Sequence, residues 1–134
     1  MVDNEYCAAE LFTVGDGLIC HDGHLVEYEQ ENKPDYLGYH LTEDFETWFA
    51  NQHQKLSLSN INDLSLSTDG IFTFKHFDGK EYSEISDREI VEFLLISEKW
   101  ENQANMLSRK LIELENEFGL KPSDDLTIVR IIMN

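Results

Sequence analysis

Cysteine and long apolar runs are scarce in this chain of 134 residues. Its two cysteines, Cys7 and Cys20, are too few for a disulfide framework and fit a reducing compartment. Cys20, His21 and His24 lack the spacing of paired zinc ligands and favour a polar hairpin tip. No apolar run approaches the roughly 18 residues of a membrane span, and no basic stretch followed by an apolar core predicts a signal peptide. We therefore expect a soluble, cytoplasmic protein without a membrane partner.

Basic residues are also scarce, because 10 Lys and Arg stand against 27 Asp and Glu, for a net charge of −17. A chain of this sign repels phosphate backbones and anionic lipids, so direct nucleic-acid binding is disfavoured. Cationic partners, metal ions and mimicry of a nucleic acid stay open. With 41 % hydrophobic residues, the chain can bury one core, and we expect residues 1–134 to form a single domain.

Alternation of apolar and polar residues predicts short antiparallel strands in the first part of the chain. LFTV, LICH and LVEY follow one another around glycine-containing turns, and LSLS at 64–67 alternates in the same way. The polar segment 29–44 predicts a loop, and 43–52 a short helix or an irregular aromatic segment. In LSLSTDGIFTF, residues 64–74, Asp69-Gly70 between two apolar runs is typical of a two-residue hairpin turn.

A long helix and a final strand are predicted near the C-terminus. Ser86 and Glu89 have the spacing of a capping box, and Gly119 with Pro122 beyond it predicts an end after Phe118. A helix of about 32 residues would be roughly 48 Å long, with a bend or break near Asn102 possible. The apolar positions allow a dimeric coiled coil, but the first turns, IVEFLLI, favour packing on a sheet. LTIVRIIM, residues 126–133, predicts a central strand covered on both faces.

Carboxylates recur at the ends of the predicted strands. Asp16 lies between two glycines, Asp69 precedes Gly70, and Asp124 and Asp125 precede the last strand. Carboxylates gathered at strand ends can form an oxygen-rich site for Mg²⁺ or Mn²⁺. Each of them alone is equally consistent with ordinary turn chemistry, because aspartate is common in turns.

The order of these motifs resembles the C-terminal part of PP2C-type metal-dependent serine/threonine protein phosphatases, in particular the bacterial branch. That family carries a V-G-D-[SG] turn and a following Asp-Gly hairpin, an [ST]-D-G motif after a core strand, and a D-[ND]-x-T motif before an apolar strand. The matching stretches are Val14–Gly17, Asp22–Leu25, Thr68–Gly70 and Asp124–Thr127. The resemblance extends from about Phe12 to Ile131.

The resemblance implies an α+β fold, in which antiparallel sheets form a sandwich flanked by helices. It also implies hydrolysis of phosphoserine or phosphothreonine in proteins by water activated at a dinuclear Mg²⁺ or Mn²⁺ centre. By position, Asp69 and Asp124 would be ligands at that centre, and Asp16 would belong to an additional metal position. The residues that would lie beside these ligands are Gly17, Gly70 and Asp125.

This sequence also departs from the family pattern. A complete domain begins with a D-G-H-G-type motif, further acidic ligands and a basic residue for phosphate, and none has a counterpart here. Asp22-Gly23-His24 fits the later hairpin instead. The dinuclear site is then incomplete and should bind metal weakly, because Mg²⁺ dehydrates reluctantly. A sandwich without its first strands would leave open edges and apolar faces, which predicts self-association, a complementing chain or a rearranged helix.

Three hypotheses about function follow. The chain is part of a PP2C-like phosphatase and is incomplete or inactive alone, or it is a relative that has lost catalysis and kept a binding role. Alternatively, it is a non-enzymatic acidic interaction protein, such as a nucleic-acid mimic or an inhibitor of a basic partner. Whether the chain is an enzyme is left open by its residues alone.

Overall fold

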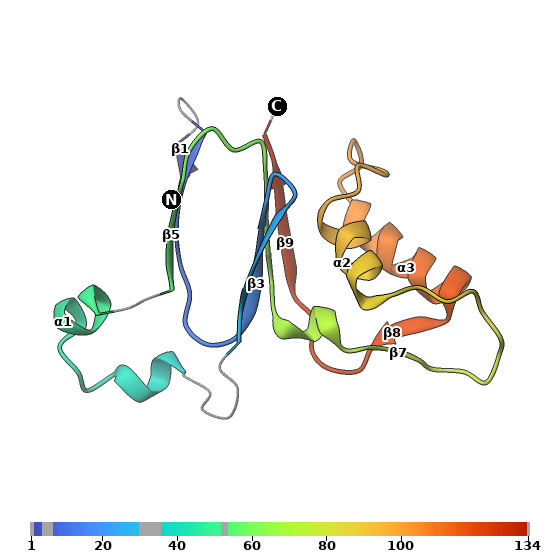
Figure 1. Ribbon diagram of the computed structural model, residues 1–134, viewed down its shortest axis with the longest axis horizontal. Coiled ribbons are helices and arrows are strands. Elements are labelled where there is room, and N and C mark those ends of the chain that lie inside the picture. The colour runs from blue at the N-terminus through green and yellow to red at the C-terminus, as the bar shows by residue number, and fades with distance from the viewer. Residues whose placement is uncertain (1, 4–6, 30–35, 52–53, 134) are drawn as a thin grey trace.

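The structure is a computed structural model that describes residues 2–3, 7–29, 36–51 and 54–133. It has an α+β fold with three antiparallel sheets (Figure 1). Sheet A has the strand order β1-β2-β5 and sheet B the order β4-β3-β6-β9, while β7 and β8 form a separate ribbon. The strands are β1 (Val2–Asp3), β2 (Ala8–Phe12), β3 (Gly17–His21), β4 (His24–Tyr28), β5 (Lys55–Leu58), β6 (Asp63–Ser67), β7 (Phe74–His76), β8 (Leu120–Pro122) and β9 (Ile128–Ile132).

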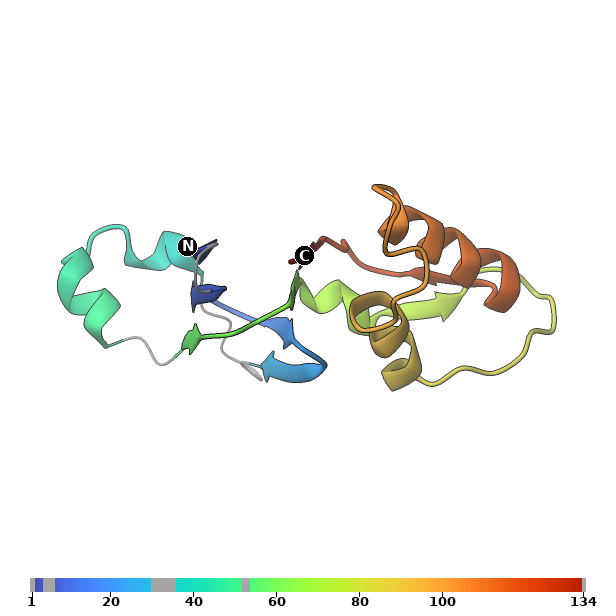
Figure 2. The same ribbon diagram turned by 90° about the horizontal axis from the view of Figure 1, so that it is seen from above.

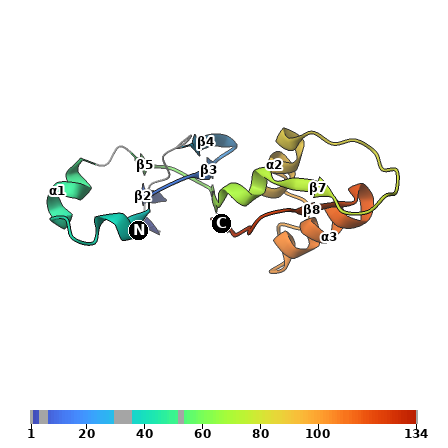
Figure 3. The same ribbon diagram turned by 90° about the horizontal axis from the view of Figure 1, so that it is seen from below.

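The helices lie at the two ends of the molecule, with sheets A and B between them (Figures 1 and 2). Helix α1 (Phe45–Ala50) and the 3₁₀ turn η1 (Leu37–His40) lie beyond sheet A. Helices α2 (Asp87–Leu95) and α3 (Met106–Phe118) lie at the opposite end, next to the β7–β8 ribbon (Figure 3). A second 3₁₀ turn, η2 (Asp69–Phe72), follows β6. Within the described ranges, no helix is long and apolar enough to cross a membrane.

Sheet B is the central layer, and it buries both of its faces. Successive side chains of a strand point to opposite faces. Accordingly, Leu18 and Cys20 of β3 belong to the cluster formed with α2, α3 and the ribbon, whereas Ile19 belongs to the cluster shared with sheet A. The predicted alternation in β6 is confirmed, because Leu64 and Leu66 face sheet A. Sheet B thus holds the two halves of the core together.

Several local predictions are confirmed. The turn between β3 and β4 has positive φ at Asp22 and Gly23, 45° and 82°, as a two-residue type I′ hairpin requires. The capping box is present, since Ser86 accepts from the Glu89 N–H and Glu89 accepts from the Ser86 N–H. Gly119 ends α3 with φ of 63°, in the left-handed region.

The prediction of one long helix from Ser86 to Phe118 is matched only in part: both predicted ends are present, and the break that the sequence allowed near Asn102 occurs between residues 95 and 106. The chain forms α2 and α3 instead, joined by a segment in which Trp100 has a φ of 61°. The carbonyls at the end of α2 accept hydrogen bonds from two buried cations, Lys110 and Arg130, so they are satisfied without a continuing helix. The coiled-coil alternative therefore has no continuous helix to support it.

Two strand predictions are also corrected. Asp69-Gly70 is not a hairpin turn, because Asp69 begins η2 and the following strand β7 pairs with β8 rather than with β6. Strand β9 is not a central strand, because within the described residues it pairs only with β6 and forms an edge of sheet B. Val129 is 50 % exposed and Ile131 is 40 % exposed on this edge.

Of the segment predicted as a loop, residues 29–44, the structure describes residue 29 and residues 36–44, and residues 30–35 lie outside the described ranges. Its described part contains η1, and the predicted short helix is confirmed as α1. Trp48 is buried against Phe12 and His40, but most large apolar side chains of this arm are exposed. The exposed side chains are Tyr36, Leu37, Tyr39, Leu41, Phe45 and Phe49.

Candidate functional site

The predicted acidic residues converge on one end of sheet B. Asp16 directly precedes β3, Asp69 lies two residues after β6, and Asp125 lies three residues before β9. The antiparallel register pairs Leu18 with Ser67 and Ser67 with Ile128, so the start of β3, the end of β6 and the start of β9 meet at the same edge. The structure thus brings together three turns that are far apart in the sequence.

Thr68 joins two of these turns directly. Its backbone N–H donates to the carbonyl of Thr127 at 3.1 Å, and its hydroxyl accepts from the Thr127 N–H at 3.0 Å. The same hydroxyl donates to the carbonyl of Asp125 at 3.3 Å. Because these bonds cross 57 to 59 residues of sequence, they fix the Thr68–Gly70 motif against the Asp124–Thr127 motif. We call this arrangement the Thr68 clasp.

Gly70 and Thr73 complete the clasp. A Cβ atom on Gly70 would lie 2.2 Å from the Asp125 carbonyl oxygen, so only glycine allows the two backbones to approach so closely. The Thr73 hydroxyl donates to the Gly70 carbonyl at 2.7 Å and accepts from the N–H of Asp124 at 3.2 Å. The Asp124 carboxylate in turn accepts from the Asp125 N–H at 2.8 Å.

Asp16 lies at the same end but lines a different surface. A shallow hollow of about 300 Å³ runs from the turn before β3 to the start of β9 and is lined by Asp16, Thr68, Thr127 and Val129, among others. The side chains of Asp69 and Asp124 are exposed and do not line this hollow. Gly17, which was expected beside the ligands, lies at the start of β3, where a Cβ would be 3.2 Å from the Ser67 carbonyl oxygen.

The positions of the acidic residues leave the predicted metal site untested. No group of three or more His, Cys, Asp or Glu side chains in the ranges 7–29, 36–51 and 54–133 is placed to hold a metal ion. A Mg²⁺ or Mn²⁺ ion takes about six oxygen ligands, and a site with one or two protein carboxylates must keep most of its water. A shared metal site for Asp16, Asp69 and Asp124 stays a prediction.

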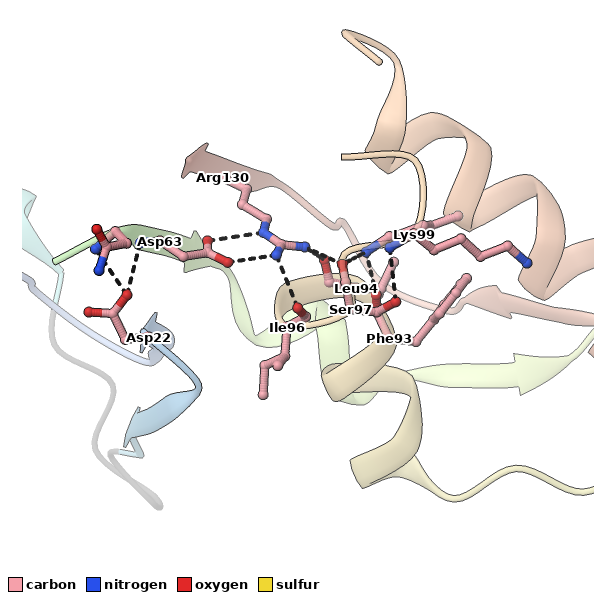
Figure 4. A network of polar contacts seen from close by, with 10 residues as sticks. Asp22, Asp63, Phe93, Leu94, Ile96, Ser97, Lys99 and Arg130 are labelled. Carbon is pink, nitrogen blue, oxygen red and sulfur yellow. Dashed lines mark hydrogen bonds and ion pairs between the residues drawn. The ribbon is translucent and has the colours of Figure 1, made fainter. Parts of the chain in front are cut away.

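A buried polar network at the end of α2 was missed by the sequence analysis (Figure 4). The Arg130 side chain is 1 % exposed and forms a bidentate ion pair with Asp63. The Nε–Oδ1 distance is 3.0 Å and the Nη2–Oδ2 distance is 2.6 Å. On its other side the guanidinium donates to the carbonyls of Ile96 and Ser97 at 3.1 and 2.9 Å. The sequence feature that could have predicted this network is Arg130 itself, because it is the one charged residue in the apolar stretch LTIVRIIM.

Lys110 is fully buried beside this network. Its Nζ donates to the Phe93 carbonyl at 2.7 Å and also to the Ser97 carbonyl. Burial, together with the nearby positive charge of Arg130, lowers the pKa of Lys110 to about 8. The two cations satisfy the last carbonyls of α2 and complement the negative end of the helix dipole. Their arrangement fixes α2 on sheet B, and neither is at the acidic end of the sheet.

The hairpin tip with Cys20, His21 and His24 behaves as a structural turn. Burial raises the pKa of the Cys20 thiol, which disfavours the thiolate that binds metals. The His21 and His24 rings stack with their centroids 5.5 Å apart, and the Asp22 carboxylate accepts from the N–H groups of Asn62 and Asp63.

In comparisons with known proteins, no family model, no curated protein and no solved structure matches the chain.

Proposed function

We propose that this chain is the C-terminal part of a PP2C-like serine/threonine phosphoprotein phosphatase domain that acts in the cytoplasm. In this proposal Asp69 and Asp124 are metal ligands, and a segment outside residues 1–134 supplies the remaining ligands. The observation that carries the proposal is the Thr68 clasp, which holds the turns of Asp69 and Asp124 together at one end of sheet B. Asp16 at the same end supports it.

The proposal also states that residues 1–134 supply only part of the metal site. With no third acidic or histidine side chain grouped with them in the described ranges, Asp69 and Asp124 would leave most coordination positions to water. We therefore expect weak Mn²⁺ binding and no significant hydrolysis by this chain alone. Substrate phosphoproteins would be engaged only after the site is completed.

Calorimetric titration with Mn²⁺ tests the metal role. We expect weak binding by the wild type and a loss of at least about tenfold in affinity for Asp69→Asn and Asp124→Asn, by analogy with the effect of losing a supporting group around a metal. Asp87→Asn is the matched control, because it removes the same charge from the first turn of α2. An absence of binding heat, or equal loss in the control, would exclude a metal site at Asp69.

An assay with a phosphothreonine peptide and Mn²⁺ tests whether residues 1–134 alone form a complete catalytic site. We expect no phosphate release above background from the chain alone. Robust release that disappears in Asp69→Asn would retain the phosphatase assignment but contradict the need for a segment outside residues 1–134.

A second candidate function is non-enzymatic binding of a basic partner. It is favoured by the arm at 36–51, whose exposed aromatic side chains are accompanied by Glu43, Asp44 and Glu46 and by no Lys or Arg. Capture of a basic nucleic-acid-binding protein, abolished by moderate salt because screening weakens exposed charge pairs, would support it. Loss of capture in Phe45→Ser would locate that binding on the arm.

A further inference from the structure

Strand β9 forms an edge of sheet B, and among the described residues no strand pairs with its outer side. The Thr127 carbonyl accepts from Thr68, and the Met133 N–H donates to the carbonyl of Asn62, so the odd-numbered residues of β9 face β6. In an antiparallel pair the direction of backbone groups alternates along the strand. The N–H and C=O groups of Ile128, Arg130 and Ile132 therefore point away from sheet B.

Hollows border this edge on both faces of the sheet. On the helix side, a hollow of about 490 Å³ is lined by Ile128, Arg130 and Ile132 together with residues 101 and 103–108. On the side of sheet A, Val129 lines the hollow of about 300 Å³, and Val129 and Ile131 are exposed. An added strand would place alternate side chains over these two hollows, which is how strand addition selects its peptides.

The edge also lacks the usual protection against pairing. Natural edge strands carry exposed charges, proline or bulges that keep other strands away. The one charged side chain in residues 126–133 is Arg130, which is 1 % exposed and is bound to Asp63. Within β9 the two exposed side chains, Val129 and Ile131, are β-branched and apolar. Such an edge is suited to a partner strand.

We propose that β9 accepts an extended segment of a different protein as a fifth strand of sheet B. The segment would have apolar side chains at alternate positions and Lys or Arg at its ends. The charge follows from Asp124 and Asp125 just before β9, from Glu101 in the hollow on the helix side, and from the net charge of −17. A second copy of this chain would bring the same charge and is disfavoured for that reason.

The added strand would lie directly beside the Thr68 clasp, because β9 begins three residues after Asp125. That a natural partner would also complete the metal site rests on the proposed function. Strand docking itself does not, because it depends on the backbone groups, the apolar contacts and the acidic charge beside β9, and not on a bound metal or on catalysis. The test is therefore made without metal and without a phosphatase readout.

The probe is a fluorescein-labelled peptide of seven alternating Thr and Val residues with two Lys at each end, and its binding is followed by fluorescence anisotropy. We expect saturable binding to the full chain and at least tenfold weaker binding to Ile131→Lys, which places a charge on the edge. Ile112→Lys is the matched control, because Ile112 is an exposed isoleucine of α3 away from this edge. The control should bind as the wild type does.

Two further measurements make the test specific. The peptide should slow hydrogen exchange at the amides of Ile128, Arg130 and Ile132 in the wild-type chain, which keeps the test independent of how the variants fold. A peptide with proline at its central position should bind at least tenfold more weakly, because proline removes a backbone donor.

The proposal is overturned by absence of binding up to 1 mM peptide, by equal loss in both lysine variants, or by unchanged exchange at the three amides. Equal binding of a peptide with Glu at its ends would also overturn it, because the proposed charge selection would be absent. A concentration-dependent dimer of the wild type that Ile131→Lys abolishes would assign the edge to a second copy instead.

Discussion

Replacement of Asp63 by asparagine should be one of the most damaging single substitutions in sheet B. Asparagine has nearly the same shape as aspartate but no charge. One of its two terminal groups is an NH₂ donor, which would face an N–H of Arg130 that is also a donor. Arg130 is 1 % exposed and cannot turn to water, and Lys110 is a second buried cation close by. The substitution therefore leaves the buried Arg130 without its carboxylate, and it removes one of the two nearby negative charges that favour protonated Lys110.

The magnitude follows from the burial of the two partners. Removing one partner of a buried ion pair costs about 3–5 kcal/mol. The Asp63 side chain is 26 % exposed, and Arg130 retains its backbone acceptors at the end of α2, so we expect a cost at or just below the lower limit of this range, about 2–3 kcal/mol. For a chain of this length the corresponding decrease in Tm is about 6–12 °C.

Urea unfolding followed by circular dichroism at pH 7 measures the effect. The control is Arg88→Gln, which breaks the pair of Arg88 and Glu92, whose side chains are 76 % and 42 % exposed, and should change the free energy of unfolding by less than about 0.5 kcal/mol. A double-mutant cycle with Arg130→Met isolates the coupling of the pair. A loss below about 1 kcal/mol for Asp63→Asn, or no coupling in the cycle, would refute the reasoning.

Two further predictions concern Lys110 and Gly70. Because the folded pKa of Lys110 is about 8 and the ordinary value is 10.5, the unfolded chain binds more protons between these pH values, and the free energy of unfolding should rise with pH across this window. The increase in the free energy of unfolding is at most about 3 kcal/mol, and Lys110→Met should lack it. If the free energy of unfolding changed equally with pH in the wild type and in Lys110→Met between pH 7 and 10, the burial of a charged Lys110 would be contradicted. Gly70→Ala should destabilise the fold by about 1–3 kcal/mol through overpacking against the Asp125 carbonyl, whereas Gly79→Ala, whose Cβ would meet nothing within 4 Å, should be nearly neutral in thermal unfolding. Equal melting temperatures for the two alanine variants would show that the clasp can relax without cost.

The sequence and the structure agree where the signal is local. The capping box of Ser86 and Glu89 involves residues three apart, and the turn at Asp22-Gly23 depends on two adjacent residues that tolerate positive φ. The candidate site was predictable in part for the same reason, because acids in turns mark strand ends. That the turns of Asp16, Asp69 and Asp124 would meet at one edge depended on strand order, which residue spacing does not determine.

The errors arose where distant parts of the chain compete for the same backbone groups. Asp69-Gly70 has hairpin chemistry, yet Thr68 bonds to Asp125 and Thr127, and β7 pairs with β8. The helix predicted from Ser86 onward ends at Leu95 because cations from α3 and β9 satisfy its last carbonyls.

The sequence by itself determined the caps, the β3–β4 turn, the alternation of β6 and the acidic balance, since each depends on neighbouring residues or on composition. Only the tertiary structure decided that the long apolar stretch after Ser86 divides into two helices and that β9 is an edge strand. It also decided that the acidic turns share one end of sheet B. These features depend on which distant groups satisfy buried backbone and charge, because a buried donor or acceptor takes whichever partner the folded chain brings to it.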